Sequence, residues 1–227
     1  MQKTEISQNL EAVKATFPNP DCLLVAVSKT KPNAAIQQAY EAGIRDFGEN
    51  KVQEITDKAA QLPKDIKWHM IGHLQRNKVK FIVPFIHLIH SVDSLRLLKQ
   101  INKEAGKAGK TINCLLQVYI ANEETKFGWD KEELNCFLLG NEVSTMHHIQ
   151  IVGLMGMATN TKDEEVIRGE FKSLKALFDA LKKAILPENV EMREISMGMS
   201  GDYLLAQEEG STMVRIGSAI FGSRNYN

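Results

Sequence analysis

The chain has 227 residues, of which 43% are hydrophobic and 25% are charged, and its 28 basic and 28 acidic side chains give a formal net charge of zero. This composition is typical of a globular protein with one substantial core, and the lack of excess positive charge argues against a nucleic-acid partner. The charged N-terminus lacks the apolar region of a signal peptide, no stretch is apolar enough to span a membrane, and the three cysteines fit neither a disulfide framework nor a zinc site, so we expect a cytoplasmic protein.

Short β-like runs alternate with helical patterns along the chain. The residues before Leu23 predict one helix that precedes the first strand. Residues 33–43 end on a glycine, which is typical of a helix C-terminus, and residues 164–184 carry apolar side chains at helical spacing. The predicted strands are, in order, 23–27, 45–48, 68–72, 86–92, 112–120, 149–157, 192–197 and 214–218. The tail after the last strand leaves room for a short closing helix.

Eight strand–helix repeats in a chain of this length predict an α/β fold, a closed (β/α)8 TIM barrel, with an open doubly wound sheet as the alternative. No Pro/Gly/Ser-rich linker interrupts the pattern. We therefore expect a single domain over residues 1–227, with an extra N-terminal helix and no C-terminal β domain. Function in such barrels lies where the strands end, so the residues that follow each strand are the candidates for a site.

Lys29 follows the first predicted strand, in the segment "LLVAVSKTKP". Side chains alternate along a strand, so Val25, Val27 and Lys29 share one face, and Lys29 projects into the top of the barrel if that face is the interior. Partial desolvation favours the neutral amine, which can form a Schiff base with an aldehyde or ketone. Pairing with a nearby acid is the alternative interpretation for Lys29. Lys31, just before a proline, is also consistent with a solvated turn.

Glycine and serine residues gather in the loops after the last two strands. The segment "ISMGMSGD" supplies Gly198, Ser200 and Gly201, and "VRIGSAIFG" supplies Gly217 and Ser218. Small residues let backbone amides approach an anion, and the corresponding loops of many barrels bind phosphate. The alternative is that these glycines only form tight turns.

Arg215 shares the face of the last strand with Gly217. Its guanidinium could donate to a ring nitrogen or a phosphate of a ligand, and a salt bridge with Glu194 or another acid is the alternative. The histidines predict no metal site. His69 and His73 are four residues apart in a predicted strand, where they would be about 13 Å apart, and His87 and His90 would face opposite sides of theirs.

Several motifs resemble those of the YggS/PROSC family of pyridoxal 5′-phosphate (PLP)-binding proteins. They are "AVSKTKP", "FGEN", "WHMIGHLQRNK", "GLMGMA" and "SMGMSGDYLLAQEEGSTMVRIGSAIFG", in this order from about Leu23 to the C-terminus. The resemblance implies the fold-type III PLP-binding barrel of the alanine racemase N-terminal domain. It also implies a monomer that acts in intracellular vitamin B6 and amino-acid homeostasis.

The resemblance assigns roles to individual residues. Lys29 matches the lysine that holds PLP as a Schiff base, Ser200 the serine that binds its phosphate, and Arg215 the arginine that faces the pyridine nitrogen. The other cofactor-binding residues that it implies are Asn50, His73, Met199, Gly217 and Ser218. The chain departs from the family pattern at Lys51, Arg76, Tyr119 and Thr159, which affects the predicted pocket wall and leaves Lys29 and the phosphate loops unchanged.

An arginine opposite the pyridine nitrogen keeps that nitrogen unprotonated and weakens the ring as an electron sink. In alanine racemases a tyrosine from an additional domain supplies a second base, whereas here only Tyr119 and Tyr203 lie near the predicted barrel mouth. We therefore interpret the protein as a PLP carrier or buffer with little or no catalysis, whose partners are PLP, amino acids and PLP-acceptor enzymes. The alternatives are a PLP-dependent amino-acid racemase and an aldolase-type barrel in which Lys29 attacks a sugar-like carbonyl.

Overall fold

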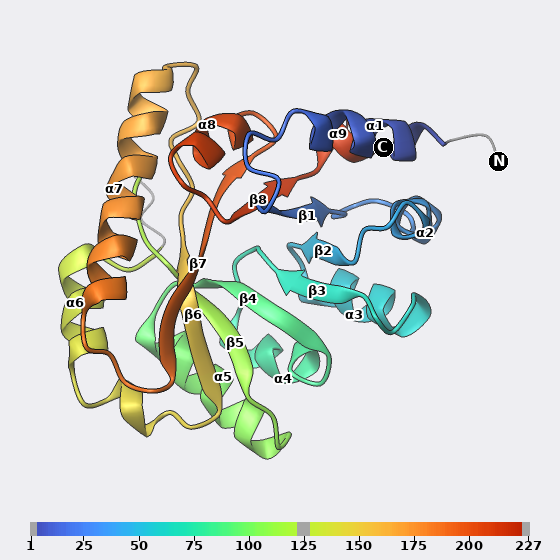
Figure 1. Ribbon diagram of the computed structural model, residues 1–227. Coiled ribbons are helices and arrows are strands. Elements are labelled where there is room, and N and C mark those ends of the chain that lie inside the picture. Colours follow the sequence, from blue (N-terminus) through green and yellow to red (C-terminus); the bar gives the residue numbers. More distant parts are fainter. Residues whose placement is uncertain (1–3, 122–127, 224–227) are drawn as a thin grey trace.

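Eight parallel strands form a closed barrel in the computed structural model, which describes residues 4–121 and 128–223 (Figure 1). The strands are hydrogen-bonded in sequence order, and β8 closes the barrel on β1. This confirms the predicted barrel and rules out the open sheet. The strands are β1 Leu23–Val27, β2 Asp46–Glu49, β3 Lys67–Met70, β4 Ile86–Val92, β5 Ile112–Gln117, β6 Ile149–Met155, β7 Val190–Met199 and β8 Met213–Ile216.

Helices connect successive strands and cover the outside of the barrel (Figure 1). Within the described part of the chain, no helix combines the length and apolar character needed to cross a membrane. The α-helices are α1 Glu5–Ala15, α2 Asn33–Glu41, α3 Val52–Gln61, α4 Val79–Ile82, α5 Leu95–Lys107, α6 Lys131–Leu139, α7 Glu164–Lys183, α8 Tyr203–Glu208 and α9 Ser218–Phe221, with 3-10 turns η1 Arg76–Lys78 and η2 Val143–Thr145.

The predicted helices begin and end at recognisable local signals. The α2 helix is followed by Gly43, whose φ of +94° is in the left-handed region that glycine adopts without strain. The α7 helix begins after Asp163, whose carboxylate accepts the backbone N–H groups of Glu165 and Val166. Its apolar face is buried against the barrel through Ile167, Phe171, Leu174, Leu177, Phe178 and Leu181.

The predicted N-terminal helix and closing helix both form, and they pack together. Figure 1 shows α1 and α9 side by side, and the amide of Asn9 donates to the carbonyl oxygen of Ile220 at 3.1 Å. The first and last helices of the described chain therefore support each other beside the β1–β8 closure.

Apolar side chains pack in two layers, one inside the barrel and one between the strands and the helices. Val25 belongs to the inner layer, whereas its neighbours Leu24 and Ala26 belong to the outer one. The other buried members of the inner layer come from four further strands and are Leu88, Leu115, Val152, Met155 and Met213. The face predicted for Val25, Val27 and Lys29 is therefore the interior face.

Shifts in strand register are the main feature that the sequence pattern did not predict. Between β3 and β4, Trp68 pairs with Ile86 and the next residue, His69, pairs with Leu88, so His87 is an extra residue in β4. Such a bulge re-aims the side chain of the inserted residue. A second shift, between β6 and β7, places Gly153 so close to its neighbour that a Cβ atom there would lie 1.7 Å from the carbonyl oxygen of Glu194.

Candidate functional site

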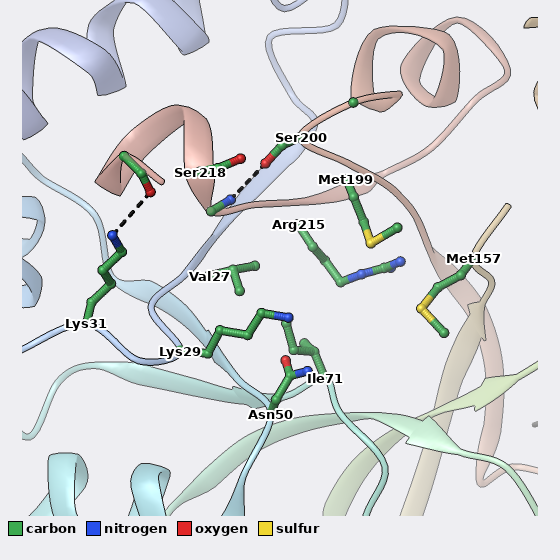
Figure 2. Close-up of a pocket in the computed structure, with 13 residues that line it drawn as sticks. Val27, Lys29, Lys31, Asn50, Ile71, Met157, Met199, Ser200, Arg215 and Ser218 are labelled. Atoms are coloured by element: carbon green, nitrogen blue, oxygen red, sulfur yellow. Dashed lines mark hydrogen bonds between the residues drawn. The ribbon is translucent and has the colours of Figure 1, made fainter. Parts of the chain in front are cut away.

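A cavity of about 290 Å³ opens at the C-terminal ends of the strands, at the end of the barrel predicted for the site. Its lining includes seven of the eight residues predicted to bind a cofactor, which are Lys29, Asn50, Met199, Ser200, Arg215, Gly217 and Ser218 (Figure 2). These residues come from the ends of β1, β2, β7 and β8, so the closed barrel brings together segments that are far apart in the sequence.

His73 is the predicted residue that the structure does not bring to this cavity. Its side chain is 59% exposed, and its Nδ1 lies 3.0 Å from Oδ2 of Asp93 in a separate surface depression. Just before His73, the chain passes very close to the residue that follows β2. A Cβ atom on Gly72 would lie 2.6 Å from the carbonyl oxygen of Asn50, so only a glycine fits there. Ile71 lines the cavity instead, and its backbone N–H donates to Glu49 at 2.9 Å.

Lys29 is presented by a tight turn at the end of β1. The turn begins as Ser28 donates its backbone N–H to Gly48 at 3.0 Å, and the next residue after Lys29, Thr30, has a φ of +64°. This conformation is uncommon for a β-branched residue. The N–H of Thr30 donates to a carboxylate oxygen of Glu54 at 2.5 Å, which holds the turn in place. The Lys29 side chain points from this turn into the cavity (Figure 2).

A buried ion-pair network supports the turn from behind. The amine of Lys58 lies 2.8 Å from Glu49, 2.6 Å from Glu54 and 2.8 Å from the carbonyl oxygen of Ser28. The hydroxyl of Ser28 also donates to Glu49 at 2.6 Å. Burial raises the pKa of the Glu49 carboxyl, and the positive charge of Lys58 opposes that shift. The network joins α3 to the ends of β1 and β2, so it fixes the position from which Lys29 extends.

Lys31 has a structural role that the sequence left open. Its amine donates to the backbone carbonyl oxygens of Phe221, Gly222 and Ser223 at 2.8, 3.1 and 3.0 Å. Lys31 is therefore not a solvated turn residue. It fastens the end of α9 to the loop that carries Lys29 (Figure 2).

Ser200, Gly217 and Ser218 form one side of the cavity. The backbone N–H of Gly217 donates to the hydroxyl of Ser200 at 3.2 Å, so the loops after β7 and β8 are in direct contact. A Cβ atom on Gly217 would lie 3.1 Å from the carbonyl oxygen of Val27, which is tighter than most such contacts. Two hydroxyls and glycine backbone at the cavity wall are groups that can donate to a phosphate.

Arg215 forms the floor of the cavity and is 4% exposed. Its guanidinium donates to the backbone oxygen and the hydroxyl of Ser196 at 2.9 and 2.6 Å, and to the backbone oxygen of Gly156 at 3.1 Å. Burial lowers the pKa of Arg215 to about 10, which leaves it charged at neutral pH. Over the described residues it forms no ion pair with Glu194, whose carboxylate accepts the hydroxyl of Thr212.

Asn50 brings an amide to the cavity wall, next to the tip of Lys29 (Figure 2). Its Oδ1 atom is buried and has no hydrogen-bond partner in the described structure. A buried polar atom without a partner is unusual in a folded protein and indicates a place for a ligand group.

Other lining residues were not singled out in the sequence, although one of them could have been. Met157 is two residues beyond Met155, which lies inside the barrel, so strand alternation predicts the same face for both. Neither of the two tyrosines near the predicted barrel mouth lines the cavity. The hydroxyl of Tyr203 instead lies 2.8 Å from Oγ1 of Thr16 at the end of α1.

Comparison with known proteins places this architecture among characterised families. The sequence profile described as "Alanine racemase, N-terminal domain" matches residues 2–225. A pyridoxal phosphate homeostasis protein from Synechocystis sp. is 39% identical over 215 residues, which cover 92% of this chain and 94% of the relative. A protein of the same name from Pasteurella multocida is 37% identical over 228 residues, covering 98% of this chain and 96% of the relative.

Solved structures agree with this placement. PipY of Synechococcus elongatus without PLP superposes with a TM-score of 0.89 at 37% identity, covering 96% of this chain and 100% of PipY. PipY with PLP bound gives a TM-score of 0.85 at 36% identity with the same coverage. An alanine racemase from Bartonella henselae with covalently bound pyridoxal phosphate gives a TM-score of 0.71 at 19% identity, and this chain covers 58% of it. That last similarity shows a shared fold alone.

Proposed function

The chain belongs to the pyridoxal phosphate homeostasis protein family, and we propose that it binds PLP as a Schiff base on Lys29 and holds it as a carrier or buffer in vitamin B6 homeostasis. The observation that carries this proposal is the convergence of an amine, a guanidinium and a serine–glycine cradle on one cavity. The binding of PLP by the related PipY supports it.

The residues of the cavity fit the chemical groups of PLP. Ser200, Gly217 and Ser218 would hold the phosphate, and Arg215 would donate to the pyridine nitrogen. The unpartnered Oδ1 of Asn50 is available to accept a hydrogen bond from a ring substituent near Lys29. PLP supplies an aldehyde that combines reversibly with amines and a ring that withdraws electrons from the carbon attached to them.

The cavity is better suited to holding PLP than to catalysing racemisation. Among the described lining residues there is no tyrosine, histidine, cysteine, aspartate or glutamate that could act as a second base. The amine of Lys31 is occupied as a donor to three carbonyl oxygens. Arg215, which stays protonated, would leave the pyridine nitrogen without a proton and so disfavour carbanion chemistry.

The visible absorption spectrum of the purified protein tests the Lys29 assignment. We expect the wild type and the surface control Lys103→Ala, on the exposed side of α5, to absorb in the visible range with PLP, and borohydride to fix the cofactor on the peptide that contains Lys29. Lys29→Ala should lack the covalent adduct. A wild type that stays colourless with added PLP would overturn the cofactor proposal, and an adduct on another lysine would overturn the assignment to Lys29.

The carrier role is tested separately by incubating the PLP-loaded protein with L-amino acids and with a PLP-requiring apoenzyme. We expect no D-amino acid beyond the amount formed by free PLP, because the described residues that line the cavity include no second base. We also expect the apoenzyme to become active. D-amino acid formed at a rate that depends on protein concentration would favour the racemase instead.

A further inference from the structure

A continuous chain of hydrogen bonds crosses the barrel interior from the cavity to the opposite end. Arg215 is 2.6 Å from the hydroxyl of Ser196, which is 3.0 Å from Nδ1 of His90. Nε2 of His90 is 2.9 Å from Nδ1 of His69, and Nε2 of His69 is 3.0 Å from Oδ1 of Asp46. All five residues are buried, and Asp46 is the first residue of β2, whereas the cavity lies beyond the ends of the strands.

With both imidazoles neutral, the two ends of this chain determine its direction. A guanidinium can only donate hydrogen bonds and an ionised carboxylate can only accept them. Arg215 therefore donates to Ser196, and the Ser196 hydroxyl donates to Nδ1 of His90. His90 then donates from Nε2 to His69, which donates from its own Nε2 to Asp46. In this arrangement both imidazoles are neutral and every donor meets one acceptor.

The charge states of the members agree with this direction. Burial lowers the pKa of His90 well below its usual value, and the positive charge of Arg215 adds to that effect, so His90 stays neutral. Burial is the largest influence and opposes the ionisation of Asp46, but the hydrogen bond from His69 and the nearby positive charge of Lys67 together leave the pKa of Asp46 below its usual value. The other titratable groups that face the chain are His87 and Lys67 near Asp46, and Asp202 near Arg215.

From this geometry we propose that Asp46 is a positioning residue for PLP, which it orients from the far end of the barrel through His69, His90, Ser196 and Arg215. The inference rests on the proposed function, because Arg215 is the member that would touch the cofactor. While the Ser196 proton is directed at His90, both lone pairs of the hydroxyl remain for Arg215. If Nδ1 of His90 carried a proton instead, the hydroxyl would accept from His90 and turn its own proton elsewhere, which would change its contact with Arg215. Directing the Ser196 proton at His90 requires that Nδ1 of His90 carry no proton. The Asp46 carboxylate maintains this state by fixing the tautomer of each imidazole.

The same chain explains a cluster that resembles a metal site. Ligand atoms of Asp46, His69 and His87 lie within 4.8 Å of one another, because the bulge in β4 turns His87 toward this end of the barrel. A metal ion would need the lone pair of Nε2 of His69, which is the atom that donates to Asp46 in the chain. We therefore interpret the cluster as the end of the hydrogen-bond chain.

The tautomers are measured directly by long-range proton–nitrogen NMR of the histidine rings in the wild-type protein. We expect both His69 and His90 to be neutral with the proton on Nε2. Protons on Nδ1 of both rings, or a protonated His90 at neutral pH, would overturn the proposed direction whatever the outcome with PLP. This measurement needs no substitution and is independent of cofactor binding.

The effect on the cofactor is tested with Asp46→Asn, with Asp57→Asn on the exposed face of α3 as the matched control. We expect Asp46→Asn to show a mixture of histidine tautomers and about tenfold weaker PLP binding, the loss that fits one weakened hydrogen bond to a charged group. The control should match the wild type. Ser196→Ala interrupts the hydrogen-bond chain beside Arg215 and should weaken PLP binding at least as much. This variant replaces Asp46→Asn in the test if Asp46→Asn does not fold.

Three outcomes decide between the interpretations. Unchanged PLP affinity and unchanged tautomers in folded Asp46→Asn would overturn the positioning role. A lower midpoint of thermal unfolding with unchanged affinity would assign Asp46 to stability alone and would also overturn it. Wild-type protein that binds no PLP would overturn the proposed function instead, while the histidine tautomers would still test the chain.

Discussion

Ser200 illustrates how a single hydroxyl can serve the fold and the ligand together. Its oxygen accepts the backbone N–H of Gly217, which joins the loops after β7 and β8, and its proton remains available to donate into the cavity. An anion held there would also lie beside Ser218, which lines the same wall of the cavity. The contribution of Ser200 should therefore depend on whether the ligand carries a phosphate.

This dependence is measurable by titrating Ser200→Ala with PLP and with pyridoxal, which has the same aldehyde and no phosphate. We expect PLP binding to weaken about tenfold, since one hydrogen bond to a charged group is lost, and pyridoxal binding to be unchanged. Ser144→Ala, an exposed serine far from the cavity, is the control. An equal loss for both ligands would show that Ser200 acts through loop structure and not through the phosphate.

At the scale of the elements, Lys58 connects a helix to two strands. It is a buried lysine paired with the buried carboxylate of Glu49, and removing one partner of such a pair leaves an uncompensated charge. We expect Lys58→Met to lower the free energy of unfolding by about 3 kcal/mol near neutral pH, measured by urea denaturation. Lys172→Met, which removes an exposed lysine 3.9 Å from an acid, should change it by less than about 1 kcal/mol. Similar small effects of both substitutions would contradict this role for Lys58.

The effect of Lys58→Met should also depend on pH. Burial raises the pKa of Glu49, and Lys58 is the main group that opposes the shift, so without Lys58 the pKa of Glu49 should rise further. A group whose pKa is raised on folding stabilises the protein below its usual pKa, and that contribution is lost as the pH rises through the folded-state value. The deficit relative to wild type should thus shrink as the pH falls from about 7 to about 5. A deficit that is constant over this range would mean that Glu49 does not titrate there.

The order and number of the strands could be predicted from the sequence, because alternation and helical periodicity are local properties. The predicted strands 23–27 and 86–92 have the bounds of β1 and β4. Four others were predicted too long at their C-terminal ends, because alternation continues where the chain lines the barrel mouth after its last ladder hydrogen bond. They are 68–72, 112–120, 149–157 and 214–218. The predicted strand 192–197 was too short, because charged residues near the N-terminal end of β7 interrupt the apolar pattern there.

The site was predictable where alternation along one strand decides the direction of a side chain and not where pairing between strands decides its place. Lys29 and Arg215 were placed by alternation, whereas His73 was misplaced because the tight passage at Gly72 is not visible in the strand pattern. The contact between His69 and His90 depends on how β3 pairs with β4, which spacing along one strand cannot reveal.

At the scale of the whole molecule, the cavity exists only when the barrel is closed. Lys29 and Asn50 follow the first two strands, whereas Ser200 and Arg215 belong to the last two. Closure of β8 on β1 brings these groups together, and the contacts of Lys31 and Asn9 with the α9 segment reinforce it. A ligand that bridges the two ends of the sequence should therefore stabilise all of the barrel.

We propose on this basis that residues 1–227 unfold as one domain. A half-barrel would expose two unpaired strand edges and half of the interior layer, so neither half should be stable alone. The two tryptophans report on different halves, because Trp68 lies in β3 and Trp129 lies just before α6, and both are buried. In Trp68→Phe and in Trp129→Phe, the fluorescence of the remaining tryptophan should change at the same urea concentration as the far-ultraviolet circular dichroism.

Bound PLP should shift that single transition as a whole. At a free concentration of about 100 times its Kd, PLP should raise the free energy of unfolding by about 2.7 kcal/mol. The unfolding free energies obtained from circular dichroism of both tryptophan variants should increase by this amount. Lys29→Ala should show a smaller shift, because noncovalent binding alone remains. An earlier transition in one half, or a shift confined to one tryptophan, would mean that the barrel consists of two units that unfold separately and that PLP stabilises only one of them.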